Sequence, residues 1–377
     1  MQIKIYSEFD HLPIQYAQCF DIGNVENFFF SIPWFENLVG NALDDTDKLR
    51  IYGVESSDAP GIPIAMLPMR YRSHASRRIS PLTLHGLANY YTPLFGPVLN
   101  RSHSNCASII KDLVHAICAD DPTWDCVDLH PLAPDAASFT ELLSSFREAG
   151  WIVQPYFCFG NWYLRLNGHS YNEYFKRLPS ALRSTVTRKR KKIEDSGRVR
   201  MQVVTRPEGI ESAILAYQTV YAASWKKPEP YADFMPGLIR TCAQKGSLRL
   251  GLAFYGERPI AAQLWIVNEG SASIYKLAYD EQFCQYSIGS ILTAHLMEYV
   301  IEGDQVREVD YLVGDDAYKQ NWMSDRRERW GLIAFNSRKL WGMLGAVRQI
   351  GGRALKRSLG KMLASFGCDT VPTQTSV

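Results

Sequence analysis

Hydrophobic and polar residues alternate along this chain in a way that predicts two groups of β-strands. Short apolar runs are separated by turns that contain Gly, Pro, Asn or Asp, as in antiparallel meanders. The first half of the chain holds two such runs and the second half holds three. The runs are residues 49–55, 62–70, 248–255, 259–267 and 272–279.

Helical patterns accompany both groups of strands, and each half has one further buried strand. This order of elements is a mixed α/β pattern. Segments 61–67 and 258–264 also look alike, since each has a turn, a small apolar residue and then a hydrophobic strand. That likeness suggests a duplication. The expected helices are 104–119, 138–149 and 290–302, and the further strands are 124–130 and 308–312.

Length and composition divide the chain into two α/β (α+β) domains and a tail. The 377 residues, 46% of them hydrophobic, are enough to bury two sizeable cores. We expect the first domain at 1–165, the second at 166–340, and a basic amphipathic tail at 341–377.

A basic helix is expected between the two halves. Leu182, Val186 and Ile193 share one face of a helix that enters after Ser180 and ends at Gly197. The rest of its surface is densely basic and has two interpretations: a solvated helix face, or a face that meets an anionic donor or acceptor. The candidates for anion contact are Arg183, Arg188 and Lys192.

Charge and cysteine usage narrow the class of protein. A formal net charge of +2 does not favour a nucleic-acid or acidic-lipid binder, and no aromatic residues interleave with the basic run. The eight cysteines form no close pair typical of a metal site or a redox motif, so no metal is expected. Reduced thiols, the absence of a signal-peptide pattern and the absence of about 20 consecutive apolar residues indicate a cytoplasmic protein.

The tail has two interpretations. Residues 338–366 mix Leu, Trp, Met and Phe with basic residues and contain no acidic residue. Such a segment could lie on an anionic membrane surface at the inner face of the membrane, or form a helix pair docked on the second domain. In the first case a lipidic or lipid-linked acceptor becomes more plausible.

Two segments in the second half carry candidate chemistry. The strand at 272–279 leads through a turn into the next helix, and the turn contains Gly289. A small residue there lets backbone N–H groups approach an anion, which the helix dipole also favours. After the strand at 308–312 comes Gly314-Asp315-Asp316-Ala-Tyr318-Lys319. The expected anion-binding residues are Gln285, Tyr286, Ser287, Ile288, Gly289 and Ser290.

These segments resemble a known family. The chain is similar to the double-domain Gcn5-related acyltransferases of the CelD/BcsL-like or BioF2-like kind, which are relatives of the FemABX peptidoglycan transferases. The resemblance runs from about Trp34 to Lys339 and is most specific at Tyr279-Asp280, 286–290 and 314–319. The chain departs from the superfamily pattern at Ile288 and Ser290, which stand at glycine or alanine positions, while Gly289 keeps one open backbone position.

The resemblance implies a fold and an activity. It implies two tandem Gcn5-related acyltransferase-like domains with mixed, largely antiparallel sheets. The second domain would hold acetyl-CoA or a longer acyl-CoA as co-substrate, with its pyrophosphate on Gln285 to Ser290, and no cofactor would be bound permanently. The first domain and the cleft would receive a small-molecule or lipid-linked amine, such as an amino sugar of a cell-envelope glycoconjugate.

Three alternative functions stay open beside this acyl-CoA-dependent activity on an envelope amine. Some similar proteins acylate a sphingoid amine with a long-chain acyl-CoA to make ceramide. A catalytically silent member would bind CoA or a glycan as an accessory protein of envelope polysaccharide synthesis. Aminoacyl transfer from tRNA is less favoured, because no long heptad pattern indicates a coiled-coil insertion. A hydrolase is excluded, because no Gly-x-Ser-x-Gly elbow is present.

Acyl transfer to an amine needs a neutral amine, a donor for the oxyanion and a proton for the thiolate. Lys319, beside Tyr318, is the candidate for oxyanion or phosphate contact. Spacing alone would favour a surface lysine, but the resemblance favours the functional role. Asp316, paired with Asp315, could orient or deprotonate the amine, or could simply cap the turn.

The remaining candidates each have a structural alternative. Asp280 is a possible base or a turn former. Tyr275 and Tyr279 could line an acceptor tunnel or pack within the sheet. His295 could face the thioester or be an ordinary core or surface histidine. Arg183 is the basic residue expected to contact substrate.

Overall fold

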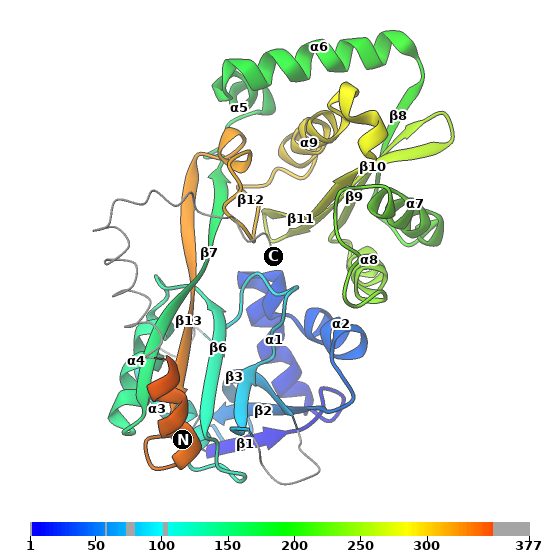
Figure 1. Cartoon of the computed structure of the whole chain (residues 1–377). Coiled ribbons are helices and arrows are strands. Elements are labelled where there is room, and N and C mark those ends of the chain that lie inside the picture. Colours follow the sequence, from blue (N-terminus) through cyan, green and yellow to red (C-terminus); the bar gives the residue numbers. More distant parts are fainter. Residues whose placement is uncertain (1, 57–58, 73–79, 101–104, 350–377) are drawn as a thin grey trace, which may run out of the picture.

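The computed structural model describes residues 2–56, 59–72, 80–100 and 105–349. Figure 1 shows two α/β halves that share one long twisted sheet. The strand order is β1-β2-β3-β4-β6-β13-β7-β12-β11-β10-β9-β8, and β5 pairs with β3 outside this path.

The first half contributes strands β1 to β7 and four α-helices among its described residues. Its helices pack on an extended apolar core beneath the strands. The elements are β1 (Gln2–Tyr6), α1 (Ile14–Glu26), η1 (Phe28–Phe30), α2 (Ile32–Ala42), β2 (Asp47–Glu55), β3 (Pro63–Arg72), β4 (Thr83–Gly86), β5 (Val98–Leu99), α3 (Cys106–Cys118), β6 (Cys126–Leu132), α4 (Ala137–Glu148) and β7 (Ile152–Arg165).

The second half begins with the basic helix α6 and ends with the long strand β13. Gly197, with φ of 61°, ends α6 at the residue expected from the sequence. The elements are α5 (Tyr171–Arg177), α6 (Ser180–Ser196), β8 (Val199–Val204), α7 (Ile210–Ala222), α8 (Phe234–Gln244), β9 (Leu248–Tyr255), β10 (Arg258–Asn268), β11 (Ser271–Tyr279), η2 (Glu281–Tyr286), α9 (Ile288–Glu298), η3 (Tyr299–Gly303), β12 (Glu308–Asp310), η4 (Lys319–Asn321) and β13 (Asp325–Phe335).

The two halves repeat one order of elements, as a duplication would produce. Apart from the two-residue strand β5 of the first half and the short η turns, both run strand, two helices, three strands, helix, strand. In each half the last helix of this series joins two parallel strands: α3 joins β4 to β6, and α9 joins β11 to β12. The two segments that look alike in the sequence lie at β3 and β10, the third strand of each repeat.

Two long strands join the halves. β13 pairs with β6 of the first half on one side and with β7 on the other, along Asp325 to Phe335. β7 in turn pairs with β12 of the second half. Each half therefore lends its final strand to the sheet of the other, and the expected boundary at 165/166 falls at the end of β7.

Helix packing also joins the halves. In Figure 1, α2 of the first half lies beside α8 of the second. The Asn37 amide donates to the carbonyl of Phe234, and the rings of Trp34 and Phe234 meet edge to face. Gly237 leaves room for this contact, because a Cβ there would lie 2.2 Å from the Asn37 oxygen. One core therefore runs from the first half under α7 and α8, while a second core lies under α5, α6 and α9.

The expected elements differ from the observed ones at a few ends. The helix expected over 290–302 is α9 up to Glu298 and continues as a π-helical turn, η3. The strand expected over 308–312 ends at Asp310, because Leu312 has φ of 55°. The helix expected from 104 begins at Cys106 within the described residues.

The described start of the tail is a helix over 340–349. Ala346 is buried against Phe335 and Cys126, whereas Leu340, Leu344 and Val347 are exposed. Most of the predicted tail, from 350 onward, lies outside the described residues, so both interpretations of it stay predictions. Within the described ranges, no helix combines the length and the apolar character that crossing a membrane requires.

Candidate active site

The parallel strands β11 and β12 separate after three paired positions. Residues 271–273 pair with 308–310, and beyond them β11 continues beside β10 while the chain after β12 follows β7. The Tyr311 N–H donates to the carbonyl of Trp162 on β7, which fixes that departure. One edge of β11 is therefore left without a strand partner among the described residues, and a cavity of about 260 Å³ opens there.

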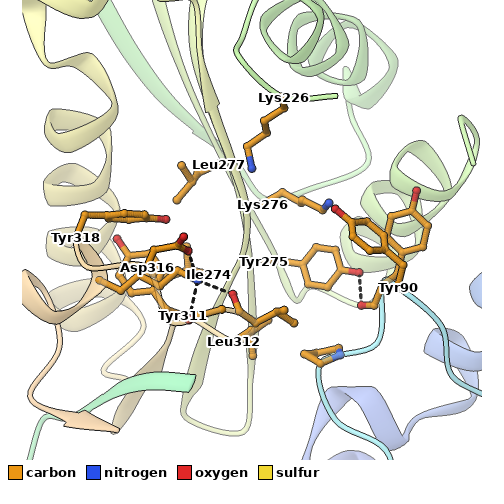
Figure 2. Close-up of a pocket in the computed structure, with 15 residues that line it drawn as sticks. Tyr90, Lys226, Ile274, Tyr275, Lys276, Leu277, Tyr311, Leu312, Asp316 and Tyr318 are labelled. Atoms are coloured by element: carbon orange, nitrogen blue, oxygen red, sulfur yellow. Dashed lines mark hydrogen bonds and ion pairs between the residues drawn. The ribbon is translucent and has the colours of Figure 1, made fainter. Parts of the chain in front are cut away.

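Both halves of the chain line this cavity, which we call the cleft cavity (Figure 2). β11 supplies one wall and the loop after β12 supplies another. The loop before β5 brings tyrosine rings from the first half, and the connection from α7 to α8 brings a lysine. The lining residues are Tyr90, Tyr91, Pro93, Lys226, Ile274, Tyr275, Lys276, Leu277, Tyr311, Leu312, Val313, Gly314, Asp316, Tyr318 and Lys319.

Lys319 holds the loop that forms one wall. Its side chain is buried, with the residue only 5% exposed, and its Nζ donates to the carbonyls of Val313 and Gly314. The same Nζ lies 3.2 Å from Asp316 Oδ2. Burial lowers the pKa of Lys319, although Asp316 opposes that shift. Lys319 therefore fixes the turn and places a positive charge in the cavity wall.

Gly314 makes this turn possible. Its φ is 103°, which disfavours any residue with a Cβ. A Cβ at this position would also lie 3.1 Å from Lys319 Nζ and 3.2 Å from Asp316 Oδ2. The turn and the Lys319–Asp316 pair therefore depend on glycine here.

The two adjacent aspartates of the loop point in different directions. Asp315 forms an ion pair with Arg326 on β13, at 2.7 Å, and this hydrogen bond lowers the pKa of Asp315. Asp316 instead pairs with Lys319 and lines the cleft cavity with a side chain that is 59% exposed. Of the two, only Asp316 is placed to meet a substrate in the cavity.

Lys226 is a cavity residue that the sequence analysis missed. Figure 2 shows its side chain extending into the cavity. Its ammonium makes no hydrogen bond or ion pair with the described residues. Burial, helped by the positive charge of Lys276, lowers the pKa of Lys226 to about 8. A lysine of this kind can lose and regain a proton near neutral pH.

Glu229 and Lys276 form a buried ion pair beside Lys226. Lys276 Nζ lies 2.9 Å from Glu229 Oε1 and sits over the rings of Tyr90 and Tyr91, 5.0 and 5.4 Å from their centroids. Burial would raise the pKa of Glu229, but Lys276, together with the nearby hydroxyls of Tyr221 and Tyr91, holds it below its usual value. Glu229 Oε2 has no partner. The pair therefore presents one open acceptor at this site.

An apolar cavity of about 500 Å³ adjoins the cleft cavity and shares Lys226 with it. Its walls come from α7, α8 and the segment between them, and most of its lining is carbon. Tyr217, Tyr221, Met235 and Pro236 are among the residues that line it. The cleft therefore combines a polar centre with an apolar side chamber.

The expected anion-binding loop lies at the same end of β11. Residues 281–286 form a 3-10 turn, Ser287 has φ of 53°, and α9 begins at Ile288 with no side chain capping it. Gly289 packs against the ring of Tyr279, the last residue of β11. Ile288 is fully buried, so only its backbone could meet a ligand. Lys189 of α6 donates to the carbonyl of Gln285 at 2.5 Å and adds positive charge nearby.

The structure brings some expected site residues together and separates others. Lys319, Asp316, Tyr318 and Tyr275 line the cleft cavity. The Tyr275 hydroxyl donates to the carbonyl of Tyr91, at 2.8 Å, and this hydrogen bond joins the two halves. Tyr318 keeps an unpaired hydroxyl among the described residues, and burial raises its pKa.

Four other expected residues lie outside the cavity. Asp280 is buried, accepts from the N–H of Gln282 and pairs with Arg258 at 2.5 Å, as a turn former would. His295 faces α6, where burial and Arg190 lower its pKa. Tyr279 packs on Trp225 with ring centroids 4.7 Å apart. Arg183 lines an open groove between α5 and α6.

The parallel strand pair opens into a cavity, and the uncapped N-terminus of α9 follows the end of β11, an arrangement that fits the acyltransferase domain predicted from the sequence. Comparison with known protein families agrees with the acyltransferase class. Residues 180–320 match the family model of the acetyltransferase (GNAT) domain. This part of the chain is therefore an acetyltransferase (GNAT) domain, as the sequence predicted, and the placement among the CelD/BcsL-like proteins stays a prediction.

Solved structures share the fold across both halves. FemX aligns over 91% of this chain and 99% of its own, with a TM-score of 0.63 and 10% identity. A conserved protein of unknown function from Bacteroides thetaiotaomicron aligns over 89% of this chain and all of its own, with a TM-score of 0.54 and 9% identity. At such identities the likeness shows the fold alone, which is the predicted mixed α/β fold. No curated protein matches the sequence.

Proposed function

We propose that this protein is an acyl-CoA-dependent N-acyltransferase that acts on an amine of a cell-envelope glycoconjugate or lipid precursor. The observation that carries the proposal is the cleft cavity, where a half-buried, unpaired lysine faces an open strand edge. The GNAT domain supports the acyltransferase class. The shared fold with FemX supports, by analogy, an acceptor from the cell envelope.

The thioester would lie along the free edge of β11. An extended arm that contains amides can pair with an exposed strand edge as an added strand does. The edge from Ile274 to Leu277 faces the cavity and offers such groups. The pyrophosphate would then meet the N-terminus of α9 at Gly289, with Lys189 close by. This path directs the thioester carbon toward Lys226 and Tyr318.

The chemistry follows from the protonation states of the cavity residues. Lys226, with a pKa of about 8, takes a proton from the acceptor ammonium. The neutral amine attacks the thioester carbonyl carbon, and the ammonium of Lys319 favours the negative charge that develops on its oxygen. The C–S bond then breaks. The attacking nitrogen loses its extra proton to water. Tyr318, whose raised pKa keeps it protonated, donates a proton to the leaving thiolate and regains, through water, the proton that the nitrogen released.

The apolar chamber supports a second candidate substrate class. A volume of about 500 Å³ lined mostly by carbon is suited to part of a hydrocarbon chain. A long-chain acyl-CoA, or a sphingoid amine as acceptor, would bury apolar surface there. Acetyl transfer to an amino sugar would leave the chamber unused, so chain length decides between the two acceptor classes.

Release of free CoA tests the proposal. Acetyl-CoA and palmitoyl-CoA are each incubated with a panel of amino sugars and long-chain amines, and the free thiol is measured. We expect amine-dependent release that Lys226→Met reduces strongly. Lys227→Met is the matched control, because Lys227 is the exposed neighbour and lies outside both cavities. Binding of CoA without turnover with any amine would instead favour the accessory-protein alternative.

A further inference from the structure

A second polar cavity, of about 640 Å³, lies between the halves at the paired end of β11 and β12. Pro93 lines the cleft cavity and the next residue, Leu94, lines this one, so the first-half loop stands between them. The walls come from the starts of β11 and β12, the end of β7, the middle of β13 and the segment after β6. We call it the interface cavity.

Arg329 is the unusual residue of the interface cavity. It lies on β13, is only 6% exposed and lines the cavity. Its guanidinium makes no hydrogen bond or ion pair with any described residue. A buried arginine without a partner is costly, since its desolvation is not compensated by contacts. Such a cost is typical of a site that a ligand completes.

The neighbouring Arg327 shows how a partly buried arginine charge is compensated by contacts. Arg327, two residues earlier on β13, bonds to Asn161, Glu308 and Asp310. Those carboxylates are therefore already engaged. The burial of Arg329 and the positive charge of Arg327 lower the pKa of Arg329, while Asp310, Asp135 and Glu308 oppose that shift. Asp135 and Glu308 also line the cavity, but neither forms a hydrogen bond or ion pair with Arg329.

A second cation faces the same space from another wall. Arg307, just before β12, is exposed and uses one nitrogen to donate to the carbonyl of Glu269 at 2.8 Å. Gly270 lets this side chain lie close to the backbone, because a Cβ there would be 2.9 Å from Arg307 Nε. The remaining donors of Arg307 are without partners among the described residues. Two arginines thus approach the cavity from β13 and from the start of β12.

We propose that the interface cavity binds a phosphoryl group, held by Arg329 and Arg307 from two walls. Arginine forks match the oxygens of a phosphate, and charge-assisted hydrogen bonds of this kind are strong where water is excluded. A tetrahedral anion can present oxygens to two walls at once. The proposal does not rest on the acyltransferase activity, since it concerns a different cavity with its own ligand chemistry.

Ligand-dependent thermal stability of the full chain tests this. Inorganic phosphate, pyrophosphate, glycerol 3-phosphate and glucose 1-phosphate are titrated at constant ionic strength against wild type, Arg329→Met, Arg329→Lys and Arg240→Met. Arg240 is the control because it loses the same charge from an exposed pair with Glu211. Phosphate also stabilises proteins non-specifically, and that part persists in every variant.

We expect saturable stabilisation of wild type and Arg240→Met, and about tenfold or more weaker binding in Arg329→Met. Arg329→Lys, which keeps the charge without the fork, should lie between them. A tighter response to an ester than to inorganic phosphate would place the phosphoryl group on a larger molecule; an equal response would indicate the free ion. Equal stabilisation of Arg329→Met and wild type by all four probes would overturn the proposal.

A ligand-free measurement separates a binding role from a structural one. Without anion, Arg329→Met should melt at the same or a higher temperature than wild type, because it removes an uncompensated buried charge. A lower melting temperature in anion-free buffer would mean that Arg329 stabilises the fold by itself, and this too would overturn the proposal.

Discussion

The two halves share one topology, yet among the described residues only the second half opens at its parallel strand pair. In the first half, β4 and β6 pair at three positions and the space beyond them is filled. Phe95 is 1% exposed, and its N–H donates to the carbonyl of Pro131 on β6 at 2.7 Å. A Cβ on Gly86, at the end of β4, would lie 2.5 Å from the Phe95 ring. In the second half, the corresponding space is the cleft cavity.

The difference shows how two halves with the same topology take different roles. The loop that closes the first half also carries Tyr90 and Tyr91 into the cavity of the second. The first half has therefore become a wall of the site, with Tyr275 of β11 bonded across to Tyr91. A catalytic role needs space between the parallel strands, and only the second half provides it among the described residues.

The largest expected effect comes from removing the buried ring of Phe95, which fills the space at the parallel strand pair of the first half. Phe95→Ala should lower the free energy of unfolding by about 3–5 kcal/mol, because it removes a fully buried ring and leaves a cavity. Chemical denaturation measures this. Acyl transfer by the remaining folded protein should be little changed. Loss of turnover out of proportion to the folded fraction would show that the first half is more than a wall.

Replacing the unpaired lysine of the open half should have the next largest effect. Lys226→Met should reduce kcat/KM by about 100-fold, the usual contribution of a positioned base. In wild type, kcat/KM should rise with pH and level off near the Lys226 pKa of about 8, a limb that the variant lacks. Steady-state assays between pH 6 and 10 measure this, and Lys227→Met should behave as wild type.

The same substitution has a signature in stability. The pKa of Lys226 in the folded chain is about 8, below the ordinary lysine value of 10.5, so the folded state binds fewer protons than the unfolded one between these values. The loss of folding stability caused by protonated Lys226 is complete below pH 8 and disappears as the pH rises toward 10.5. Lys226→Met should therefore melt higher than wild type at pH 7, and the gain should shrink at pH 10. A constant difference across this range would contradict the lowered pKa.

A smaller effect is expected at the turn of the cavity wall. Gly314→Ala should cost about 1–2 kcal/mol from its positive φ, with a further disturbance of the Lys319–Asp316 pair. Activity should fall with it. Gly61→Ala is a control, since Gly61 has φ of 84° but no atom near its Cβ position and lies far from the site in the β2–β3 turn. Equal loss of activity in both variants would indicate strain alone.

The smallest effect is expected at His295. Because it faces α6 and Arg190 and does not line the cleft cavity, His295→Ala should leave kcat/KM unchanged. A marked loss with a normal melting curve would return His295 to the list of catalytic candidates.

The sequence predicted the fold and part of the site for clear physical reasons. The strands of the second half have strong apolar runs bounded by turn residues. Lys319, Asp316 and Tyr318 lie close together along the chain, so a local motif could bring them to one place. Asp280 and His295 had the same local support, but contacts with Arg258 and with α6 take them elsewhere.

The missed residues come from distant segments. Lys226 and Glu229 lie in a polar connection between α7 and α8, and Tyr90 and Tyr91 lie in the other half. Their proximity follows from the packing of α2 on α8 and from the shared sheet, neither of which alternation along the chain can specify. A weak signal existed, since Trp225-Lys-Lys-Pro-Glu229 places charges next to an aromatic residue between two helices.

Calorimetric titration of palmitoyl-CoA and acetyl-CoA tests most directly that the opened strand pair of the second half is the acyl-CoA site. Wild type and Leu277→Trp are compared, because Leu277 lines the cleft cavity and a larger ring there would fill it. We predict one binding site per chain in wild type and loss of binding in Leu277→Trp with an unchanged fold. Two sites per chain, or undiminished binding in Leu277→Trp, would contradict the assignment of the cleft cavity.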